Sequence, residues 1–341
     1  MIVSKETNLF FILFSLFLVY CIFALCYVNV HKDEKLQDWI MARNNSSKNQ
    51  QNDMIICEAL LERWNPEIPA LIIDSKFLSN IIKERCYHDP SQPIKIGVDA
   101  KYRKDDFFVN DKRFDVIYYT VNGSKDFLDF DVDDRRIIPI NFVTEYIGNF
   151  EIPTDVKQFI AFWERSKFMN CVGLRVLRNE SEKVVLAAQK STEVLAGLRD
   201  ELIDNGMFPF LNDETLFGWY RECSWIPHTF NMNLAVFHKD YNPEYLKKLE
   251  NQETEFSIVR RSGMVEKSFE MTLVPKGSTF PRIDISLIYD GDENGTITHS
   301  YVSGLADGRT KYKYFYSVHD PWCAAELHDH IFWVTCSPRL L

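Results

Sequence analysis

The sequence predicts an α/β (α+β) protein behind a single N-terminal transmembrane helix, and three observations lead to this fold class. Residues 9–28 carry no charge, short apolar runs alternate with polar turns between residues 57 and 169, and the rest of the chain changes from a helix–strand–helix pattern to a mostly β pattern. Such a mixture is typical of sheets packed against helices. We therefore divide the chain, in order, into a tail (1–8), a membrane anchor (9–30), a stem (31–55), an N-terminal α/β domain (56–170) and a C-terminal mixed-sheet domain (171–341).

The composition excludes several classes of protein. The 341 residues include 39 basic and 49 acidic side chains, and the resulting formal charge of −10 argues against a nucleic-acid partner. Phenylalanine, tyrosine and tryptophan are abundant enough to build a core, which excludes a disordered chain. Only 13 glycines are present, which argues against collagen, glycine-rich linkers and glycine-based nucleotide loops. A folded protein follows, but no function.

The uncharged run at residues 9–28 predicts the membrane anchor. A helix of this length crosses the hydrocarbon core of a bilayer, which is about 30 Å thick. A cleaved signal peptide is the alternative, but its apolar region is usually shorter and ends at an A-x-A-like site that this sequence does not show. Residues 31–55 are rich in Asn, Gln and Ser and predict a solvated stem.

Acceptor motifs for N-glycosylation set the predicted orientation. Five Asn-x-Ser/Thr motifs follow the anchor, at Asn44, Asn45, Asn122, Asn179 and Asn294. Their position predicts a type II protein, with the tail in the cytoplasm and the body in the lumen. The cysteines beyond the anchor would then meet an oxidising compartment. They are Cys57, Cys86, Cys171, Cys223, Cys323 and Cys336. Several pairings are possible, and the sequence does not select one.

Hydrophobic periodicity predicts the individual elements. In the N-terminal domain, strands are expected at 70–73, 116–119 and 137–142, and a helix at 155–169. The clearest helix of the chain is expected at 181–205, where apolar residues form one stripe and Gly206 ends it. A helical turn at 216–223, a strand at 231–237 and a helix at 243–252 follow. The last predicted strands are 255–260, 269–274, 283–289 and 311–316.

Strand alternation places polar side chains on one face of the predicted sheet. Residues two apart on a strand share a face, so Asn231 and Asn233 point away from the core that Met232 enters. In the strand at 283–289, Asp284 faces the side opposite to the apolar residues. Two polar residues from one strand and an Asp from its neighbour is the arrangement with which nucleotidyltransferase-type sheets hold a divalent metal.

Residues 216–223 (Leu-Phe-Gly-Trp-Tyr-Arg-Glu-Cys) and the Ile-Pro-His that begins at Ile226 resemble the fukutin family, which is related to LicD-type phosphocholine transferases. The resemblance is strong over 210–237 and weaker at 68–74 and 322–336. It implies a nucleotidyltransferase-like C-terminal domain in a Golgi type II enzyme. Such an enzyme transfers ribitol phosphate from CDP-ribitol to the O-mannosyl glycans of glycoproteins.

The resemblance also implies roles for single residues. It places Asn231, Asn233 and Asp284 around a Mg²⁺ or Mn²⁺ ion, and it makes Asp284 a catalytic residue. Two further catalytic positions are Thr215, near the donor phosphates, and Arg221, beside an anionic group. Glu214 and Trp219 occupy positions expected to contact the donor. Buried packing of Trp219 and a structural ion pair of Arg221 are the alternatives.

The chain departs from the family pattern at the positions expected to bind the metal and the donor. Asn231 and Asn233 stand where the family has Asp-x-Asp, and Glu214 stands where it has the glycine of Gly-Thr. The absence of two carboxylates beside a divalent ion weakens its electrostatic binding by roughly several kcal/mol, even at an effective dielectric constant of about 20. The sequence therefore also fits a catalytically inactive relative, which binds glycans or serves as the accessory subunit of a glycosylation complex.

A third function is a sugar-nucleotide glycosyltransferase that uses the overlapping Asp-x-Asp pattern of Asp129, Asp131 and Asp133. The same spacing is common in solvated turns, which we favour here. Residues 290–295 predict a hairpin turn, in which Asp-Gly and Asn-Gly supply positive φ angles. His328 and His330 are expected at the surface, because a histidine pair without a third ligand is rarely a metal site.

Overall fold

The computed structural model describes residues 68–82, 92–103, 112–147, 150–174, 181–226, 231–294, 296–306, 310–317 and 322–338. The predicted anchor and stem lie outside these ranges. Within them, no helix combines the length and the apolar character needed to cross a bilayer. The chain divides into two compact units, Met1–Arg63 with Asn80–Tyr87, and Trp64–Ser79 with His88–Leu341. All described residues belong to the second unit, apart from the end of helix α2 (Ser75–Ile82).

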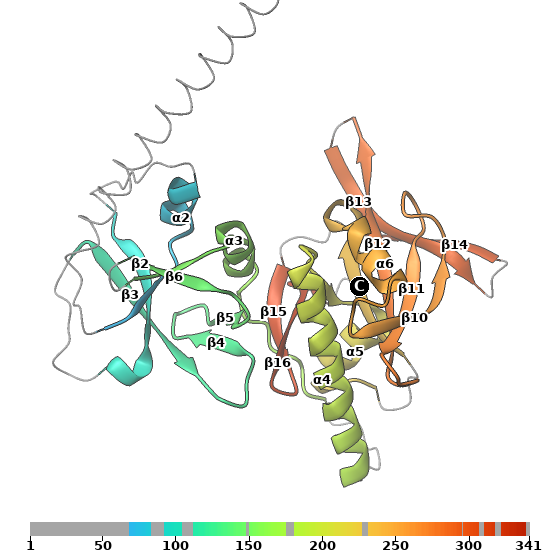
Figure 1. Cartoon of the computed structure of the whole chain (residues 1–341), viewed down its shortest axis with the longest axis horizontal. Helices are drawn as coiled ribbons and strands as arrows, with labels where there is room; N and C mark the ends of the chain where they lie inside the picture. Colours follow the sequence, from blue (N-terminus) through green and yellow to red (C-terminus); the bar gives the residue numbers. More distant parts are fainter. Residues whose placement is uncertain are drawn as a thin grey trace, which may run out of the picture. The chain divides into compact units, whose positions relative to one another are not determined.

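Two mixed sheets confirm the α/β class (Figure 1). The first has the order β5-β4-β3-β2-β1-β7-β6, with parallel pairs β2–β3 and β1–β7 and antiparallel pairs elsewhere. Its strands are β1 (Ala70–Ile72), β2 (Ile94–Asp99), β3 (Phe114–Val121), β4 (Phe127–Phe130), β5 (Arg136–Pro139), β6 (Thr144–Ile147) and β7 (Phe150–Pro153). Helix α3 (Val156–Glu164) follows, and the Asp155 carboxylate accepts a hydrogen bond from the Gln158 N–H at its start. The helix ends earlier than predicted, because residues 167 and 168 form β-bridges.

The second sheet has the order β10-β11-β12-β9-β8-β16-β15, and β13 and β14 extend from β12. Strand β12 is parallel to β9 and antiparallel to β11. The strands are β8 (Phe210–Leu211), β9 (Asn231–Phe237), β10 (Phe256–Ser262), β11 (Glu270–Pro275), β12 (Arg282–Glu293), β13 (Thr296–Ala306), β14 (Thr310–Tyr316), β15 (Trp322–Leu327) and β16 (His330–Thr335). The hairpin turn predicted at 290–295 is confirmed only in part: Asn294 turns at a φ of 58° between β12 and β13, whereas residues 290–293 continue β12 and Gly291 has no positive φ.

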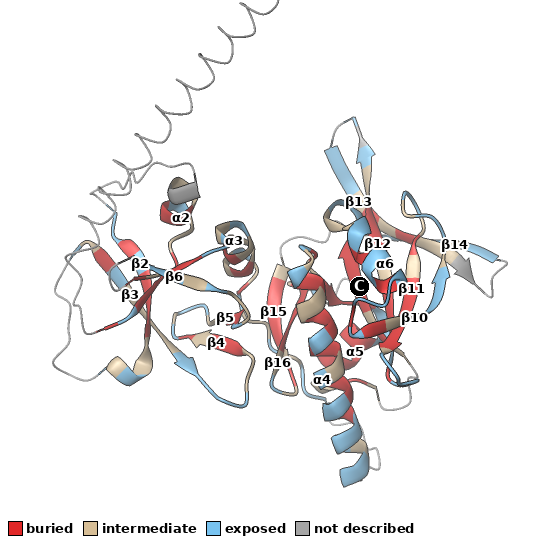
Figure 2. Ribbon diagram, viewed as in Figure 1, coloured by how far each residue is buried: buried red, intermediate tan, exposed pale blue. Residues whose placement is uncertain are grey.

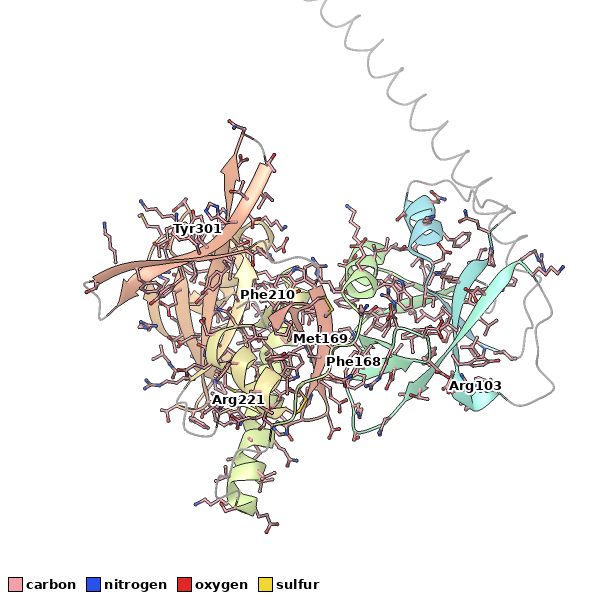
Figure 3. All side chains as sticks on the ribbon, turned by 180° about the vertical axis from the view of Figure 1, so that it is seen from behind. Arg103, Phe168, Met169, Phe210, Arg221 and Tyr301 are labelled. Carbon is pink, nitrogen blue, oxygen red and sulfur yellow. A yellow bond between two sulfur atoms is a disulfide. The ribbon has the colours of Figure 1, made fainter. Side chains whose placement is uncertain are left out.

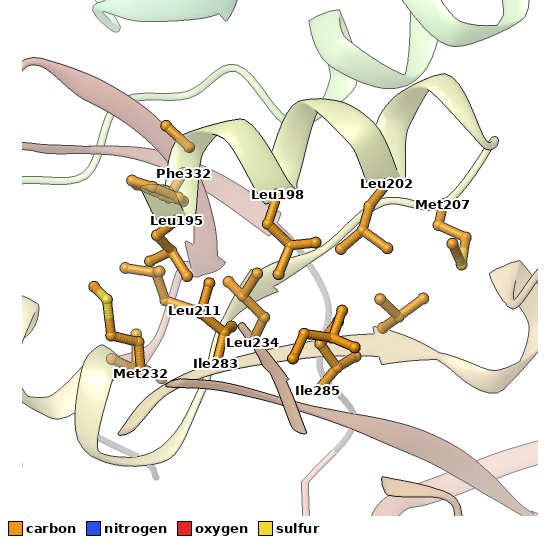
Figure 4. Close-up of a cluster of buried hydrophobic side chains, with 14 of the residues drawn as sticks. Leu195, Leu198, Leu202, Met207, Leu211, Met232, Leu234, Ile283, Ile285 and Phe332 are labelled. Carbon is orange, nitrogen blue, oxygen red and sulfur yellow. The ribbon is translucent and has the colours of Figure 1, made fainter. Parts of the chain in front are cut away.

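Helices α4 (Glu182–Asp204), α5 (Asp213–Glu222) and α6 (Pro243–Glu250) complete this half of the chain. The apolar stripe of α4 is buried, and Figure 4 shows Leu198 pointing toward Leu234 and Ile285 of the central strands. Each fully buried leucine of this kind stabilises the fold by about 1.5–3 kcal/mol. Gly206, with a φ of 75°, follows the helix as predicted. One face of the sheet thus packs into the core, and Figure 2 shows its residues as buried.

Two disulfides join cysteines of the described residues. Cys171 is bonded to Cys223, and Cys323 is bonded to Cys336 across the β15–β16 hairpin (Figure 3). The first bond fixes the end of α5 to the segment that precedes α4. The other four cysteines of the chain lie outside the described residues.

Candidate functional site

The register of β9 and β12 brings the predicted polar residues together. The two strands are parallel neighbours in which Asn233 pairs with Asp284 and Asn231 pairs with Arg282. Because the alternate residues Met232, Leu234, Ile283 and Ile285 fill the core, the polar side chains share the opposite face. The Asn231 Nδ2 donates a hydrogen bond of 2.7 Å to Asp284 Oδ2.

Both oxygens of Asp284 are engaged. Thr272, its cross-strand neighbour on β11, donates a hydrogen bond from Oγ1 to the second oxygen, Oδ1. The two side chains are 4 % and 9 % exposed, respectively. Arg260 on β10 extends the same row, since its guanidinium donates to Thr272 Oγ1 at 3.4 Å and to Glu270 Oε1 at 3.0 Å. A buried carboxylate here is satisfied by neutral donors and linked to an ion pair.

The start of helix α5 is attached directly to β9. Thr215 is buried, and its Oγ1 accepts a 2.8 Å hydrogen bond from the backbone N–H of Asn233. The N–H of Asn212, the residue before the helix, donates to the Asn233 carbonyl at 3.2 Å. The helix begins at Asp213, three residues before the predicted turn, and Asp213 has a positive φ of 45°. Thr215 thus lies next to the Asn233–Asp284 pair.

A cavity of about 400 Å³ opens at this end of α5, and its lining includes Asn212, Asp213, Glu214, Phe217, Tyr220 and Tyr316. Asp213 keeps a surface in contact with solvent, yet the cavity wall desolvates its carboxyl. This desolvation, reinforced by the charges of Glu214, Glu270 and Asp284, raises the pKa of Asp213 above its usual range. The cavity is therefore a site of concentrated negative charge beside aromatic rings.

The two other predicted site residues on α5 lie elsewhere. Trp219 is fully buried, and its Nε1 donates a 3.0 Å hydrogen bond to the Glu326 carbonyl. This placement corresponds to buried packing, the alternative to stacking on a ligand. Arg221 contacts the carboxylate of Glu222, and its guanidinium lies 4.5 Å from the centre of the Phe217 ring. Figure 3 labels Arg221 among the side chains of this half of the chain.

The arrangement does not fit a divalent ion as it stands. Mg²⁺ prefers oxygen ligands and is usually held through one or two carboxylates. Asp284 is the one carboxylate of the predicted set, and both of its oxygens already accept hydrogen bonds. In the ranges that the structure describes, no three His, Cys, Asp or Glu side chains are grouped as metal ligands. The expected Mg²⁺ or Mn²⁺ ion stays a prediction.

Two residues of the competing Asp-x-Asp pattern, Asp129 and Asp131, are ion-paired. Asp129 accepts two hydrogen bonds from Arg135, at 2.9 and 2.7 Å, and Asp131 pairs with Arg103 at 2.5 Å. The histidines of the β15–β16 turn diverge in the same way. His328 Nε2 lies 3.0 Å from the Ser224 hydroxyl, whereas His330 Nδ1 lies 2.8 Å from Asp126 Oδ2. Neither set is brought together around a common point.

Two predicted glycosylation sites can be placed. Asn122 is exposed, and its Oδ1 accepts hydrogen bonds from the N–H and the hydroxyl of Ser124 in a turn. Asn294 is exposed in the β12–β13 hairpin. Asn44, Asn45 and Asn179 lie outside the described residues.

The sequence did not single out several residues of this site, namely Asp213, Arg260, Glu270, Thr272, Tyr220 and Tyr316. Thr272 was detectable in principle, because it alternates with the apolar residues of a predicted strand. Asp213 was not, because its role depends on a backbone turn just before the motif. Tyr316 ends a strand whose partner, β13, was not predicted.

Comparison with known proteins identifies the family. The model of the W02B3.4-like N-terminal domain matches residues 56–170. The Caenorhabditis elegans protein W02B3.4 is 49% identical over 283 residues, which is 83% of this chain and 73% of that protein. T07A5.1 of the same organism is 40% identical over 286 residues, 83% of this chain and 75% of that protein.

Similarity to fukutin is more distant and partial. The mouse ribitol-5-phosphate transferase FKTN is 26% identical over 146 residues, 41% of this chain and 31% of the mouse protein. The human ribitol-5-phosphate transferase FKTN is 25% identical over 173 residues, 48% of this chain and 36% of the human protein. The high identity to W02B3.4 over most of both proteins decides the relationship: the chain belongs to the W02B3.4-like family.

Proposed function

We propose that this chain is a fukutin-like phosphosugar transferase of the ribitol-5-phosphate type, with a nucleotidyltransferase-like C-terminal domain, that acts on O-mannosyl glycans in the secretory pathway. One observation supports this most strongly. The separate segments that carry the resemblance meet at one place, where Thr215 on α5 contacts Asn233 on β9, and β9 lies in register with Asp284 on β12. The distant similarity to the ribitol-5-phosphate transferase FKTN supports the chemical class.

The chain's contribution to such a transfer would be positioning. In a phosphoryl transfer of this kind, an acceptor hydroxyl attacks the donor phosphorus while the bond to the leaving nucleotide oxygen breaks. The hydrogen bonds from Asn212 and to Thr215 fix the cavity wall to β9. A fixed wall would keep acceptor and donor at a constant separation, which lowers the entropic part of the barrier.

Turnover of CDP-ribitol by the purified chain, with an O-mannosyl glycopeptide acceptor and with Mg²⁺ or Mn²⁺, tests this function. We expect turnover by the wild type and at least a hundredfold loss in Asp284→Asn, which keeps the shape of the side chain. Asp129→Asn is the matched control at the competing Asp-x-Asp pattern and should retain turnover. A wild type that is silent with both ions contradicts the proposal, and loss in Asp129→Asn alone would favour the glycosyltransferase.

A catalytically inactive glycan-binding or accessory protein is the second candidate. The hydrogen bonds that occupy both oxygens of Asp284 favour it, because they satisfy the carboxylate without an ion. Binding of Mn²⁺ by the wild type and by Asn231→Asp combined with Asn233→Asp separates the candidates. Absent binding in the wild type and gained binding in the double variant, together with no turnover, would support the inactive relative.

We also propose the type II topology, with the body in the Golgi or endoplasmic reticulum lumen and with N-linked glycans. The uncharged run at 9–28 and the exposure of Asn122 and Asn294 support it. Protease treatment of sealed microsomes should leave the chain beyond about residue 30 intact. Cleavage within the described ranges before detergent is added would overturn this topology.

A further inference from the structure

Strand β14 carries three tyrosines on one face, and Lys313 and Phe315 on the other. Of the described strands, only β13 pairs with β14, so β14 is an edge strand that extends from the main sheet (Figure 1). Residues two apart on a strand share a face, and Tyr312, Tyr314 and Tyr316 therefore form one row. We call these three residues the tyrosine row. Figure 2 shows that much of β14 is exposed.

The rings of the tyrosine row are close together and accessible. The centroids of Tyr312 and Tyr314 lie 5.2 Å apart, and the Tyr314 side chain is 60% exposed. Tyr312 pairs with Gly304 on β13, where an added Cβ would lie 2.5 Å from the Tyr312 hydroxyl. The glycine thus leaves room for the ring against β13. Tyr312 and Tyr314 thus form a pair of adjacent rings, and Tyr316 follows on the same face of the strand.

The tyrosine row leads into the acidic cavity. Tyr316, at its end, lines that cavity together with Asp213, Glu214 and Tyr220. Burial, together with the charge of Asp213, raises the pKa of Tyr316 to about 12, so its hydroxyl stays protonated at physiological pH. The combined surface therefore offers apolar ring faces, neutral hydroxyls and carboxylate acceptors.

We propose that the tyrosine row and the adjoining cavity form a binding site for a neutral oligosaccharide. The proposal deepens the proposed function, and it rests on that function only for the role of the oligosaccharide as acceptor. Tyrosine rings present an apolar face with a polar tip, which suits the apolar faces of sugar rings. Carboxylates accept several hydrogen bonds each, which suits the hydroxyls of the same sugars.

The acidic side chains of the cavity argue against an anionic ligand. Among the described residues that line the cavity, the charged ones are acidic, and anions would be repelled. Arg260, whose charge acts on Tyr312, is paired with Glu270 at 3.0 Å. A basic peptide is the competing ligand, because carboxylates and tyrosine ring faces also attract cations. The row itself favours the sugar, because rings that follow one another along a strand match the repeated apolar faces of a sugar chain.

The opposite face of β14 provides a matched control. Lys313 lies 3.6 Å from the centre of the Tyr301 ring, and Phe315 packs on His299 with ring centroids 5.2 Å apart. Phe315 is 61% exposed, almost the same fraction as Tyr314, its neighbour in sequence. Figure 3 labels Tyr301 at this position. Two adjacent aromatic residues of equal exposure thus point to opposite faces of one strand.

Binding to the full chain tests the proposal, with an O-mannosyl trisaccharide and maltotriose as neutral probes and a lysine-rich peptide as the competing one. We expect trisaccharide binding by the wild type in titration calorimetry, at least a tenfold higher Kd in Tyr314→Ala, and little change in Tyr314→Phe or Phe315→Ala. Maltotriose binding that depends on Tyr314 in the same way would also support a neutral-sugar site. Thermal unfolding checks that each variant is folded.

Three results would overturn the proposal: no binding of either neutral probe, an unchanged Kd in Tyr314→Ala, or Tyr314-dependent binding of the lysine-rich peptide alone. Turnover and trisaccharide binding, both measured on the wild type and on Tyr314→Ala, separate this proposal from the proposed function. If the trisaccharide binds but the wild type shows no turnover, the transferase is wrong and the binding site stands. If turnover is present and Tyr314→Ala changes neither Kd nor KM for the acceptor, the binding site is wrong and the transferase stands.

Discussion

Replacement of Asn231 by aspartate tests the geometry of the candidate site most directly. The Asn231 Nδ2 lies 2.7 Å from Asp284 Oδ2, and Asp284 is 9 % exposed. The substitution Asn231→Asp keeps the shape of the side chain but exchanges a hydrogen-bond donor for a second negative charge. At that separation, two charges repel by about 6 kcal/mol at an effective dielectric constant of about 20.

A shared proton limits the actual cost. The introduced carboxyl can hold its proton in the folded chain, and holding it at pH 7 against an unfolded pKa of about 3.9 costs about 4 kcal/mol. Because this carboxyl has a raised pKa in the folded state, the loss of stability grows with pH above about 3.9. We therefore expect Asn231→Asp to be less stable than the wild type by about 4 kcal/mol at pH 7 and about 1.5 kcal/mol at pH 5.

Urea unfolding followed by tryptophan fluorescence at both pH values measures this difference. Asn122→Asp, in an exposed turn, is the control and should stay within about 0.5 kcal/mol of the wild type. Both proteins are produced without glycosylation, since Asn122 lies in an acceptor motif. If Mg²⁺ then binds the introduced pair, a concentration of a hundred times its Kd should restore about 2.7 kcal/mol. An Asn231→Asp variant as stable as the wild type at pH 7 without metal would refute the contact between Asn231 and Asp284.

Three further predictions concern other parts of the second unit. Arg199→Met should cost about 3–5 kcal/mol in urea unfolding, because Arg199 is 1 % exposed and pairs with Asp126 and Asp200, whereas Arg261→Met, at an exposed pair, should cost less than about 1 kcal/mol. Burial lowers the pKa of His328 below 6.5, so the wild type should lose thermal stability as pH falls below about 6.5. The variant His328→Asn, in which Asn tolerates the positive φ of this position, should lose less stability. Equal losses in the two proteins would contradict the burial effect. Gly218→Ala should destabilise by about 1–2 kcal/mol in the same urea assay, because its Cβ would lie 2.9 Å from the Ser224 carbonyl oxygen; unchanged stability would show that this segment can move away.

Elements with strong periodicity and clear ends were predicted well. The strand at 231–237 is observed with those bounds, and the helix predicted at 181–205 is observed as Glu182–Asp204. In α4 the buried stripe gives the helical period, and in β9 Asn231 and Asn233 alternate with the buried Met232 and Leu234 at the start of the strand. The helix predicted at 243–252 is observed as Pro243–Glu250. Its first residue is a proline, and Asn242 caps it.

Strands without alternation were missed. In β15 and β16 nearly every residue is buried, so no period of two is visible, and the turn between them uses His328 and Asp329 at positive φ rather than glycine. Strand β8 has only two residues and is defined by its partners. Strand β13 follows the predicted Asn-Gly turn, but its small and polar residues gave no strand signal. In each case tertiary pairing, rather than local propensity, decides the structure.

The candidate site was predicted in part for the same reason. Asn231, Asn233 and Asp284 were placed on one face from alternation, and their strands are neighbours in the sheet. The hydrogen bond from Thr272 to Asp284 depends on the register of β11 with β12, which no local pattern specifies. The pairing of Cys171 with Cys223 depends likewise on where α5 ends, so the sequence could not choose it.

The two asparagines and the tyrosine row bear on different steps of a transfer. In the proposed transfer, Asn231 would lie where the charge of the donor is neutralised, whereas Tyr314 lies on a strand that pairs only with β13 among the described strands. The exchange of carboxylates for amides at the donor site would remove turnover without changing the aromatic residues of β14. Tyr314-dependent sugar binding with no turnover would therefore place this chain as a glycan-binding relative. Turnover that persists despite the asparagines would instead require another source of charge. Asp213, which lines the cavity beside Glu214, is the first residue to substitute.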